Sequence, residues 1–177
     1  KKIGFNSSLS FRKIDGKFRF YLGNNIESDK YDHNDMGFLY DNNKINNALS
    51  LGYYIFQPTD LMIKSSYTFD IDHEMLYKPI AYKEIAIKGQ AHVVWKNHLF
   101  TGLNLRYNFE EHDYNEARIE NQVFIRPPKV NFSLYSSSDY RKRLALDTRI
   151  GIKYTEQNKN NKLYLRVSPR FRLNDHL

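Results

Sequence analysis

The sequence of 177 residues contains no cysteine and only one tryptophan. Without cysteine the chain has no disulfide, no thiolate metal site and no cysteine nucleophile. Cysteine usage therefore does not indicate whether the protein lies in an oxidising or a reducing compartment. Runs of apolar residues are short, and none approaches the roughly 18 to 20 residues that a membrane-spanning helix requires. The chain also lacks the serine elbow, the zinc-protease motif and the glycine-rich phosphate loop of common enzymes. These absences exclude a helical membrane protein and leave no recognised catalytic motif.

Alternation of apolar and polar residues is the main pattern of the chain. From Leu144 to Tyr154 the even-numbered positions are apolar or β-branched, and the odd-numbered positions are charged or small. Such a pattern indicates a strand with one apolar and one polar face. It recurs about nine times and predicts strands over residues 3–14, 17–22, 45–55, 61–71, 85–95, 99–109, 130–138, 144–154 and 162–173.

The connections between these segments alternate in length. Short turns are predicted at 15–16, 57–60, 96–97 and 139–143, and longer connections at 23–44, 72–83, 110–129 and 157–161. Strands of about ten residues joined in this way are typical of a transmembrane β-barrel, with short periplasmic turns and longer extracellular loops. A soluble β-sandwich has the same alternation. Strand length and aromatic residues near strand ends, such as Trp95 and Phe109, favour the barrel.

We therefore expect an all-β, antiparallel, up-and-down transmembrane β-barrel. Bacterial single-chain barrels close with an even number of strands, whereas about nine are predicted here. Residues 1–177 are thus expected to form one partial barrel domain, a fragment that supplies about nine strands of a larger barrel. The chain begins without an initiator methionine or a signal peptide, as expected for a mature protein or an internal fragment.

Two loop motifs carry a family resemblance. The first runs from Glu27 to Leu39, and its core comprises Asn34, Asp35, Met36, Gly37, Phe38 and Leu39, followed by Asn42-Asn43. The second runs from Asp113 to Pro128 and includes Tyr114, Glu116, Arg118, Arg126 and Pro127. Both motifs resemble those of an uncharacterised outer-membrane family, best known from Bacteroidota. The second motif differs from that family's pattern at Ala117, where proline is usual, and at Asn121-Gln122, where Gly-Arg is usual.

The resemblance implies a location and an architecture. Members of that family typically join an N-terminal domain like the family-nine carbohydrate-binding modules to a large outer-membrane barrel. The chain is therefore expected in the bacterial outer membrane of a Gram-negative cell, as a barrel portion without its N-terminal domain. Its expected partners are outer-membrane lipid, lipopolysaccharide and other outer-membrane proteins of a complex.

Basic residues are prominent on the predicted polar faces. Six of them are expected to face the barrel lumen: Arg106, Arg149, Lys153, Arg166, Arg170 and Arg172. Rings of Arg and Lys favour anion passage. The alternative, which we favour, is that they pair with inward acids such as Asp70, Asp147 and Glu110 and brace the lumen. No nucleic-acid partner is expected, because aromatic and basic side chains lie mostly on opposite faces of the strands.

Two polar clusters are possible cation sites. Asp32-His33-Asn34-Asp35 is rich in the oxygen ligands of hard cations, and Glu110-Glu111-His112-Asp113 adds a histidine. Turn formation explains the first cluster better, and a solvated extracellular loop explains the second cluster better. We therefore predict no metal ion, no cofactor and no catalytic residue, although a serine–histidine pair on a strand face could escape motif analysis.

The leading functional hypothesis is a non-enzymatic outer-membrane protein, a structural or accessory subunit of a larger assembly. The net charge of +7 permits contact with anionic partners such as lipid phosphates. The second hypothesis is a channel or uptake pore for anionic or glycan-derived solutes. The third is an outer-membrane hydrolase, for which the sequence shows no motif.

Overall fold

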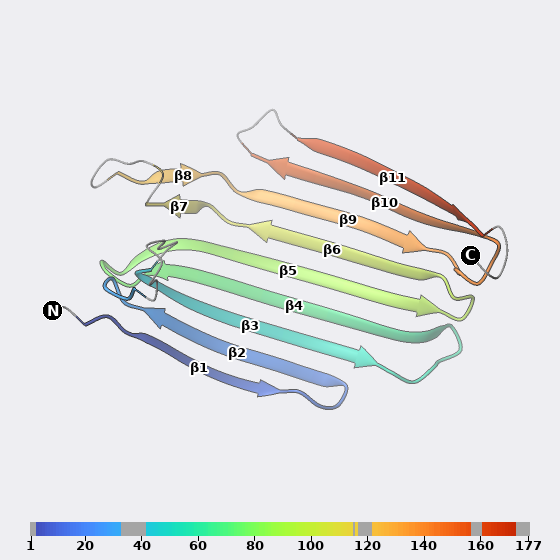
Figure 1. Cartoon of the computed structure of the whole chain (residues 1–177), viewed down its shortest axis with the longest axis horizontal. Coiled ribbons are helices and arrows are strands. Elements are labelled where there is room, and N and C mark those ends of the chain that lie inside the picture. Colours follow the sequence, from blue (N-terminus) through green and yellow to red (C-terminus); the bar gives the residue numbers. More distant parts are fainter. Residues whose placement is uncertain (1–2, 33–41, 115, 117–121, 157–160, 173–177) are drawn as a thin grey trace.

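The computed structural model describes residues 3–32, 42–114, 116, 122–156 and 161–172. These residues form eleven strands, all antiparallel to their neighbours (Figure 1). The strands are β1 (Asn6–Lys13), β2 (Phe18–Glu27), β3 (Lys44–Ile55), β4 (Met62–Leu76), β5 (Ala81–Trp95), β6 (Phe100–Asn108), β7 (Glu111–Asp113), β8 (Phe124–Arg126), β9 (Lys129–Ser137), β10 (Leu144–Thr155) and β11 (Lys162–Phe171). Among the described residues no helix is long and apolar enough to cross a membrane.

Nine of these strands form one sheet in the order β1-β2-β3-β4-β5-β6-β9-β10-β11. Each strand pairs with its predecessor in the chain, except that the small ribbon β7-β8 is inserted between β6 and β9. The predicted up-and-down antiparallel arrangement of about nine long strands is confirmed. Within the described residues the sheet is not closed, because β1 pairs only with β2 and β11 only with β10. Figure 1 shows these two strands at opposite edges of the sheet.

Local turn chemistry explains the connections at one end of the sheet. In the β1–β2 hairpin Gly16 has a φ of 82°, a left-handed conformation that glycine adopts without strain. The carboxylate of Asp15 accepts a hydrogen bond of 2.7 Å from the Gly16 backbone N–H. Between β5 and β6, His98 takes a positive φ of 60°, and the side chain of Asn97 accepts from the Leu99 N–H at 3.1 Å. The four turns predicted to be short lie at this end, which we call the short-turn end, whereas the brief β4–β5 turn over residues 77–80 lies at the opposite end.

Three strands are clearly longer than predicted. The connection expected over residues 72–83 is wrong, because β4 continues to Leu76 and β5 begins at Ala81. Asp72 and Glu74 lie on the polar face of β4, where the alternation continues beyond the predicted end of the strand. An ion pair between Lys83 and Glu74 stabilises this extension. Likewise, β2 runs on to Glu27, beyond its predicted end at residue 22.

The region expected as one long loop over residues 110–129 contains the ribbon β7-β8. Pro127 and Pro128 separate β8 from β9, since proline cannot donate to a ladder. The alternation is weakest over residues 130–138, because Ser136 and Ser138 stand where apolar residues are expected, yet residues 129–137 form β9. Ser136 lies opposite Thr148, and their hydroxyl groups hydrogen-bond at 2.8 Å. A satisfied hydroxyl pair therefore replaces the apolar contact that the pattern lacked.

The sheet has one apolar face, on which paired residues form continuous rows across eight strands. We call three of these the apolar rows. They are Phe11-Leu22-Leu49-Ile71-Ile87-Tyr107-Val130-Tyr154, then Phe20-Leu51-Phe69-Gly89-Leu105-Phe132-Ile152-Leu163, then Phe18-Tyr53-Tyr67-Ala91-Leu103-Leu134-Ile150-Leu165. Within the described strands, the one charged residue paired with a member of these rows is Lys13, which lies opposite Phe20 at the end of β1.

Every residue of these apolar rows is exposed or half-buried, and none is buried. Phe11 is 67% exposed, Ile152 47% and Leu163 73%. Among the described residues only Ala86 and Ala145 are buried hydrophobic residues, and both fall on the opposite face of the sheet. A soluble sandwich would bury its apolar face against a second sheet. No second sheet covers this face in the part of the chain that the structure describes.

Candidate functional site

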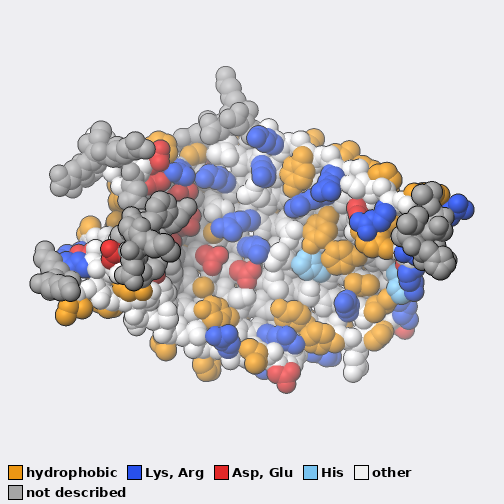
Figure 2. Space-filling model, in the orientation of Figure 1, with side chains coloured by type: hydrophobic (Ala, Val, Ile, Leu, Met, Phe, Trp, Pro, Cys, Tyr) orange, Lys and Arg blue, Asp and Glu red, His pale blue; other side chains and the backbone are white. Residues whose placement is uncertain are grey.

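The polar face carries the basic residues that the sequence singled out. Arg106 lies on β6, Arg149 and Lys153 on β10, Arg166 and Arg170 on β11, and Arg172 directly follows β11. Cross-strand pairing places the five residues within strands on one face, opposite to the apolar rows. Figure 2 shows that Lys and Arg side chains gather over this face, with a few acidic side chains among them.

Four basic residues on the neighbouring strands β10 and β11 form a group, which we call the basic cluster: Arg149, Lys153, Lys162 and Arg166. Arg149 on β10 lies directly opposite Arg166 on β11, and Lys153 lies directly opposite Lys162. All four are exposed. Lys162 was not among the predicted site residues. The alternation placed it on the polar face, but only the register of β10 and β11 brings it beside Lys153.

The arginines of the cluster contact hydroxyl groups and aromatic rings. Arg149 Nη2 donates to Ser133 Oγ at 3.3 Å, and Arg166 Nε donates to Ser168 Oγ at 3.1 Å. The Arg149 guanidinium carbon also lies 5.9 Å from the ring centroids of both Tyr135 and Tyr164. These contacts orient the guanidinium groups without neutralising their charge.

The acids expected to pair with these bases have other partners. Asp147 accepts from the Tyr140 hydroxyl, Asp70 accepts from the Ser50 hydroxyl, and Glu110 contacts His112 at 2.9 Å. Within the described residues no ion pair joins Arg149, Lys153, Lys162 or Arg166 to a carboxylate. The expected bracing of the lumen by such pairs is therefore not found for this cluster.

Tyrosine rings on this face lie against glycines. A Cβ added to Gly102 would come within 2.2 Å of the Tyr135 ring, and one added to Gly151 within 2.3 Å of the Tyr164 ring. Each tyrosine is the direct cross-strand partner of its glycine. The absence of a side chain thus lets each ring lie flat across the neighbouring strand. The expectation that aromatic and basic residues occupy opposite faces is too simple here, because both rings flank Arg149.

Two hollows adjoin the cluster on the polar face. One, of about 390 Å³, is lined by Asn104, Tyr135, Asp147, Arg149 and Arg166 among others. The second, of about 660 Å³, is lined by Arg149, Lys153, Lys162, Tyr164 and their neighbours. Arg149 borders both hollows.

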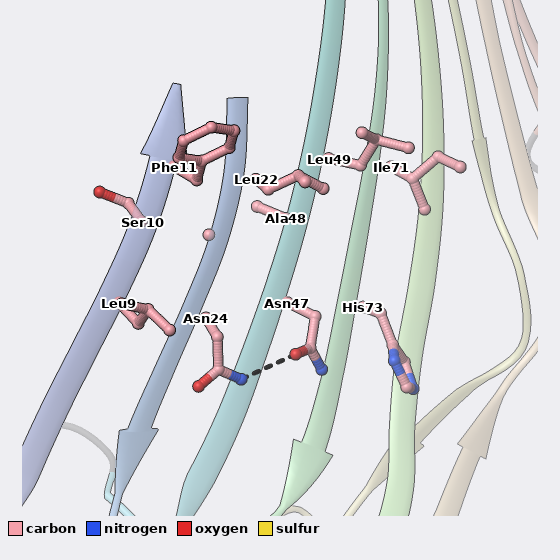
Figure 3. A pocket seen from close by; sticks show the side chains of 11 residues that line it. Leu9, Ser10, Phe11, Leu22, Asn24, Asn47, Ala48, Leu49, Ile71 and His73 are labelled. Atoms are coloured by element: carbon pink, nitrogen blue, oxygen red, sulfur yellow. Dashed lines mark hydrogen bonds between the residues drawn. The ribbon is translucent and has the colours of Figure 1, made fainter. Parts of the chain in front are cut away.

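A third hollow, of about 480 Å³, lies mostly over the apolar face of β1–β4 (Figure 3). Leu9, Leu22 and Ile71 contribute its apolar walls. At one end the Asn24 amide donates to the Asn47 side-chain oxygen at 2.8 Å, and His73 follows on the next strand. The apolar rows therefore end at a row of polar side chains on this side of the sheet.

Residues within and next to the first loop motif connect several strand ends by hydrogen bonds. Asn43, with a φ of 58°, exchanges two hydrogen bonds of 2.8 Å with the backbone of Lys78 in the β4–β5 turn. Asn42 donates to the Tyr31 carbonyl at 2.8 Å, and the buried Ser28 hydroxyl accepts from the Phe5 N–H at 2.9 Å. The predicted core residues Asn34, Asp35, Gly37, Phe38 and Leu39 lie outside the described residues.

Arg126 is the centre of the second loop motif. Its guanidinium contacts Asp113 at 2.6 Å, Glu111 at 3.6 Å and Glu116 at 4.0 Å. Tyr114 donates to the Tyr82 carbonyl at 2.7 Å and so ties the ribbon to β5. Pro127 ends the ribbon, and Arg118 lies outside the described residues. The acids of this loop thus serve ion pairs that hold β7 to β8.

Replacing Arg126 by glutamine is expected to loosen the ribbon. The substitution leaves three carboxylates facing one another without their shared cation. Because the network is partly exposed, the expected loss is about 1 kcal/mol, which corresponds to a roughly fivefold faster amide exchange in β7 and β8. Lys129→Gln is the control, since Lys129 makes one longer contact of 3.5 Å with Glu111. Equal exchange rates in the two variants would contradict the central role of Arg126.

The described residues bring few metal-binding or catalytic groups together. Among the described residues no three His, Asp or Glu side chains come together in a way that could hold a metal ion. His33, Asn34 and Asp35 of the first cluster lie outside those residues. One serine–histidine pair does occur on the polar face, with Ser66 Oγ 3.4 Å from His92 Nδ1. No carboxylate in the described part of the chain hydrogen-bonds to His92, so the hydrolase stays a hypothesis without an orienting acid.

The short-turn end has its own charged pair. Arg141 donates to the Asp139 carboxylate at 2.9 and 2.8 Å. These hydrogen bonds hold the pKa of Asp139 well below its usual range. Next to this turn, the Arg170 guanidinium lies 4.5 Å from the Tyr140 ring centroid, and Arg172 donates to the Tyr140 carbonyl at 3.1 Å. Arg170 and Arg172 therefore form a group at the strand end, apart from the basic cluster.

Fold and surfaces together define an all-β protein whose nine-stranded antiparallel sheet has an exposed apolar face and a basic polar face. The chain belongs to the family described as a domain of unknown function (DUF5916), which matches residues 1–177. No curated protein and no solved structure matches the chain. The expected membership of an uncharacterised family is confirmed, and its location and domain partners are matters for proposal.

Proposed function

We propose that this chain is a non-enzymatic, integral outer-membrane protein whose nine-stranded sheet forms part of the wall of a transmembrane β-barrel. One observation carries the proposal: the apolar rows extend across eight strands, are exposed, and have a single charged neighbour at their margin. A surface of this extent is unfavourable in water and favourable against lipid. The alternation of lipid-facing and lumen-facing residues along each strand is the pattern of such barrels.

Further features support an orientation. All four connections at the short-turn end are brief, whereas the opposite end combines the long connection between β2 and β3 and the ribbon β7-β8 with the brief β4–β5 turn. In bacterial barrels the short turns are periplasmic and the longer loops extracellular. Aromatic residues such as Trp95 and Phe109 stand close to the strand ends, where interfacial girdles occur. The short-turn end would then face the periplasm.

The resemblance of the loop motifs extends the proposal. We assign the protein to the outer membrane of Bacteroidota, with a domain like the family-nine carbohydrate-binding modules preceding a larger barrel. Its role would be that of a structural or accessory subunit in an outer-membrane assembly. Lipid, lipopolysaccharide and other outer-membrane proteins are the proposed partners, and nucleic acid is not.

The proposal is tested by extraction and gel migration. We expect the protein to sediment with membranes, to require detergent for extraction, and to migrate differently on a gel before and after heating. A native pull-down with mass spectrometry should recover other outer-membrane proteins if the chain is an assembly subunit. A protein that is fully soluble without detergent would refute the membrane location.

The basic cluster favours a second candidate, a pore for anionic or glycan-derived solutes. Exposed arginine and lysine side chains lining a channel select anions. Such a pore predicts anion-selective conductance in planar bilayers, whereas a lumen sealed by side chains or loops predicts none. Conductance without stable protein partners would favour the pore over the structural subunit.

A further inference from the structure

We propose that the basic cluster binds an extended anion that carries two phosphate-, sulfate- or carboxylate-type groups. One group would lie between Arg149 and Arg166, and the other between Lys153 and Lys162. This inference goes beyond a structural role. It also does not depend on conduction, because a binding site can exist in a closed lumen.

The first argument is electrostatic. Like charges directly opposite each other on a sheet face are destabilising, and here two such pairs are adjacent along the same two strands. At two other positions on this face lysines meet acids: Lys44 lies opposite Glu27 and contacts it at 3.5 Å, and Lys83 contacts Glu74. Those lysines are partly buried, whereas the four members of the cluster are exposed. A third like-charged pair, Lys88 and Arg106, also lies on this face, but only in the cluster do two such pairs share the same two strands. Within the described residues the cluster lacks the ion pairs that Lys44 and Lys83 make.

The second argument is geometric. Positions 149 and 153 are four residues apart on one strand, so the two pairs are about 13 Å apart at roughly 3.3 Å per residue. Gly151 and the flat ring of Tyr164 lie between them. Arginine binds such groups through paired N–H donors, and lysine through a compact charge. The spacing fits an extended ligand with a charge at either end better than a single small ion.

Nearby groups leave room for such a ligand. The two hollows beside the cluster share Arg149, and Asn104 and Asp147 border the one that contains Arg166. Asp147 is the only acid among these lining residues, and it accepts a hydrogen bond from Tyr140. One carboxylate against four cations leaves the local charge strongly positive.

Calorimetry on the whole protein, in detergent where it requires detergent, tests the site. The probes are inorganic phosphate and a linear polyphosphate, each titrated at low and at moderate salt. We expect polyphosphate to bind at least tenfold more tightly than phosphate, because it engages both pairs. Arg149→Gln/Arg166→Gln should weaken polyphosphate binding by about tenfold or more.

A matched variant separates a specific site from diffuse charge. Lys44→Gln/Lys83→Gln also removes two positive charges from this face, but at positions already paired with acids. It should change polyphosphate affinity by less than about twofold. Equal losses in the two double variants would overturn the site.

A failure of polyphosphate to bind would also overturn the inference. The outcome is independent of the membrane proposal. If the protein is soluble yet binds polyphosphate, the membrane proposal fails and the proposed site stands. If the protein requires detergent but does not bind polyphosphate, only the proposed site fails.

Discussion

Replacing Leu105 by arginine is expected to lower the free energy of unfolding from a bilayer by about 2–4 kcal/mol. Leu105 lies in the middle apolar row and is 44% exposed. If that row faces lipid, the guanidinium must enter hydrocarbon, where its cost is largest at the bilayer midplane. Urea titration of the protein in lipid vesicles, followed by heat-modifiable migration, measures the change.

Two controls identify the cause. Thr68→Arg adds the same charge to the polar face of β4, at the loss of one long hydrogen bond of 3.4 Å to Gln90, and should change stability by less than about 1 kcal/mol. Leu105→Ala separates the loss of the leucine side chain from the gain of charge. If Leu105→Arg and Thr68→Arg were equally tolerated, the apolar rows would meet water or protein polar groups, and the proposed location would fail.

Gly151→Ala is expected to destabilise the sheet by about 1–3 kcal/mol, as overpacking does in a filled site. The new methyl group would lie 2.3 Å from the Tyr164 ring and 2.8 Å from the Phe132 carbonyl oxygen. The ring can turn away, but the carbonyl belongs to the backbone of β9 and cannot. The same titration reports the loss.

Gly89→Ala is the matched control, because nothing lies within 4 Å of a Cβ at that position. A methyl group there meets no neighbour and restricts the unfolded chain, so stability should stay unchanged or rise by about 0.5–1 kcal/mol. Combining Gly151→Ala with Tyr164→Ala should cost less than the sum of the two single changes. Equal effects at Gly89 and Gly151 would contradict the packing of tyrosine on glycine.

Most of the strand pattern could be predicted because the alternation of side chains is local. The segment from Leu144 to Tyr154 assigns each residue to a face without knowledge of its neighbours, and β10 bears this out. The same reasoning predicted that β4 ends at residue 71, whereas the strand continues to Leu76. Asp72 and Glu74 resemble loop residues in composition, yet a strand whose polar face is open accepts charge as readily as a loop does.

The candidate site was predicted only in part. Arg149, Lys153 and Arg166 were assigned to the polar face from the pattern, but the partners expected for them were acids. Lys162 and the tyrosines on glycines were missed, because a glycine in a strand does not reveal which ring covers it. The second loop motif was recognised by its residues, whereas the grouping of its acids around Arg126 required the ribbon β7-β8.

By itself the sequence determined that the chain is all-β, that about nine strands follow one another in antiparallel order, and that each has an apolar and a polar face. These properties repeat every second residue and depend on neighbours in the chain. Only the tertiary structure decided which residues lie opposite one another, including Arg149 with Arg166 and Gly102 with Tyr135. Register is set by hydrogen-bond ladders between separate segments, so the like-charged pairs of the basic cluster become apparent only when β10 and β11 are aligned.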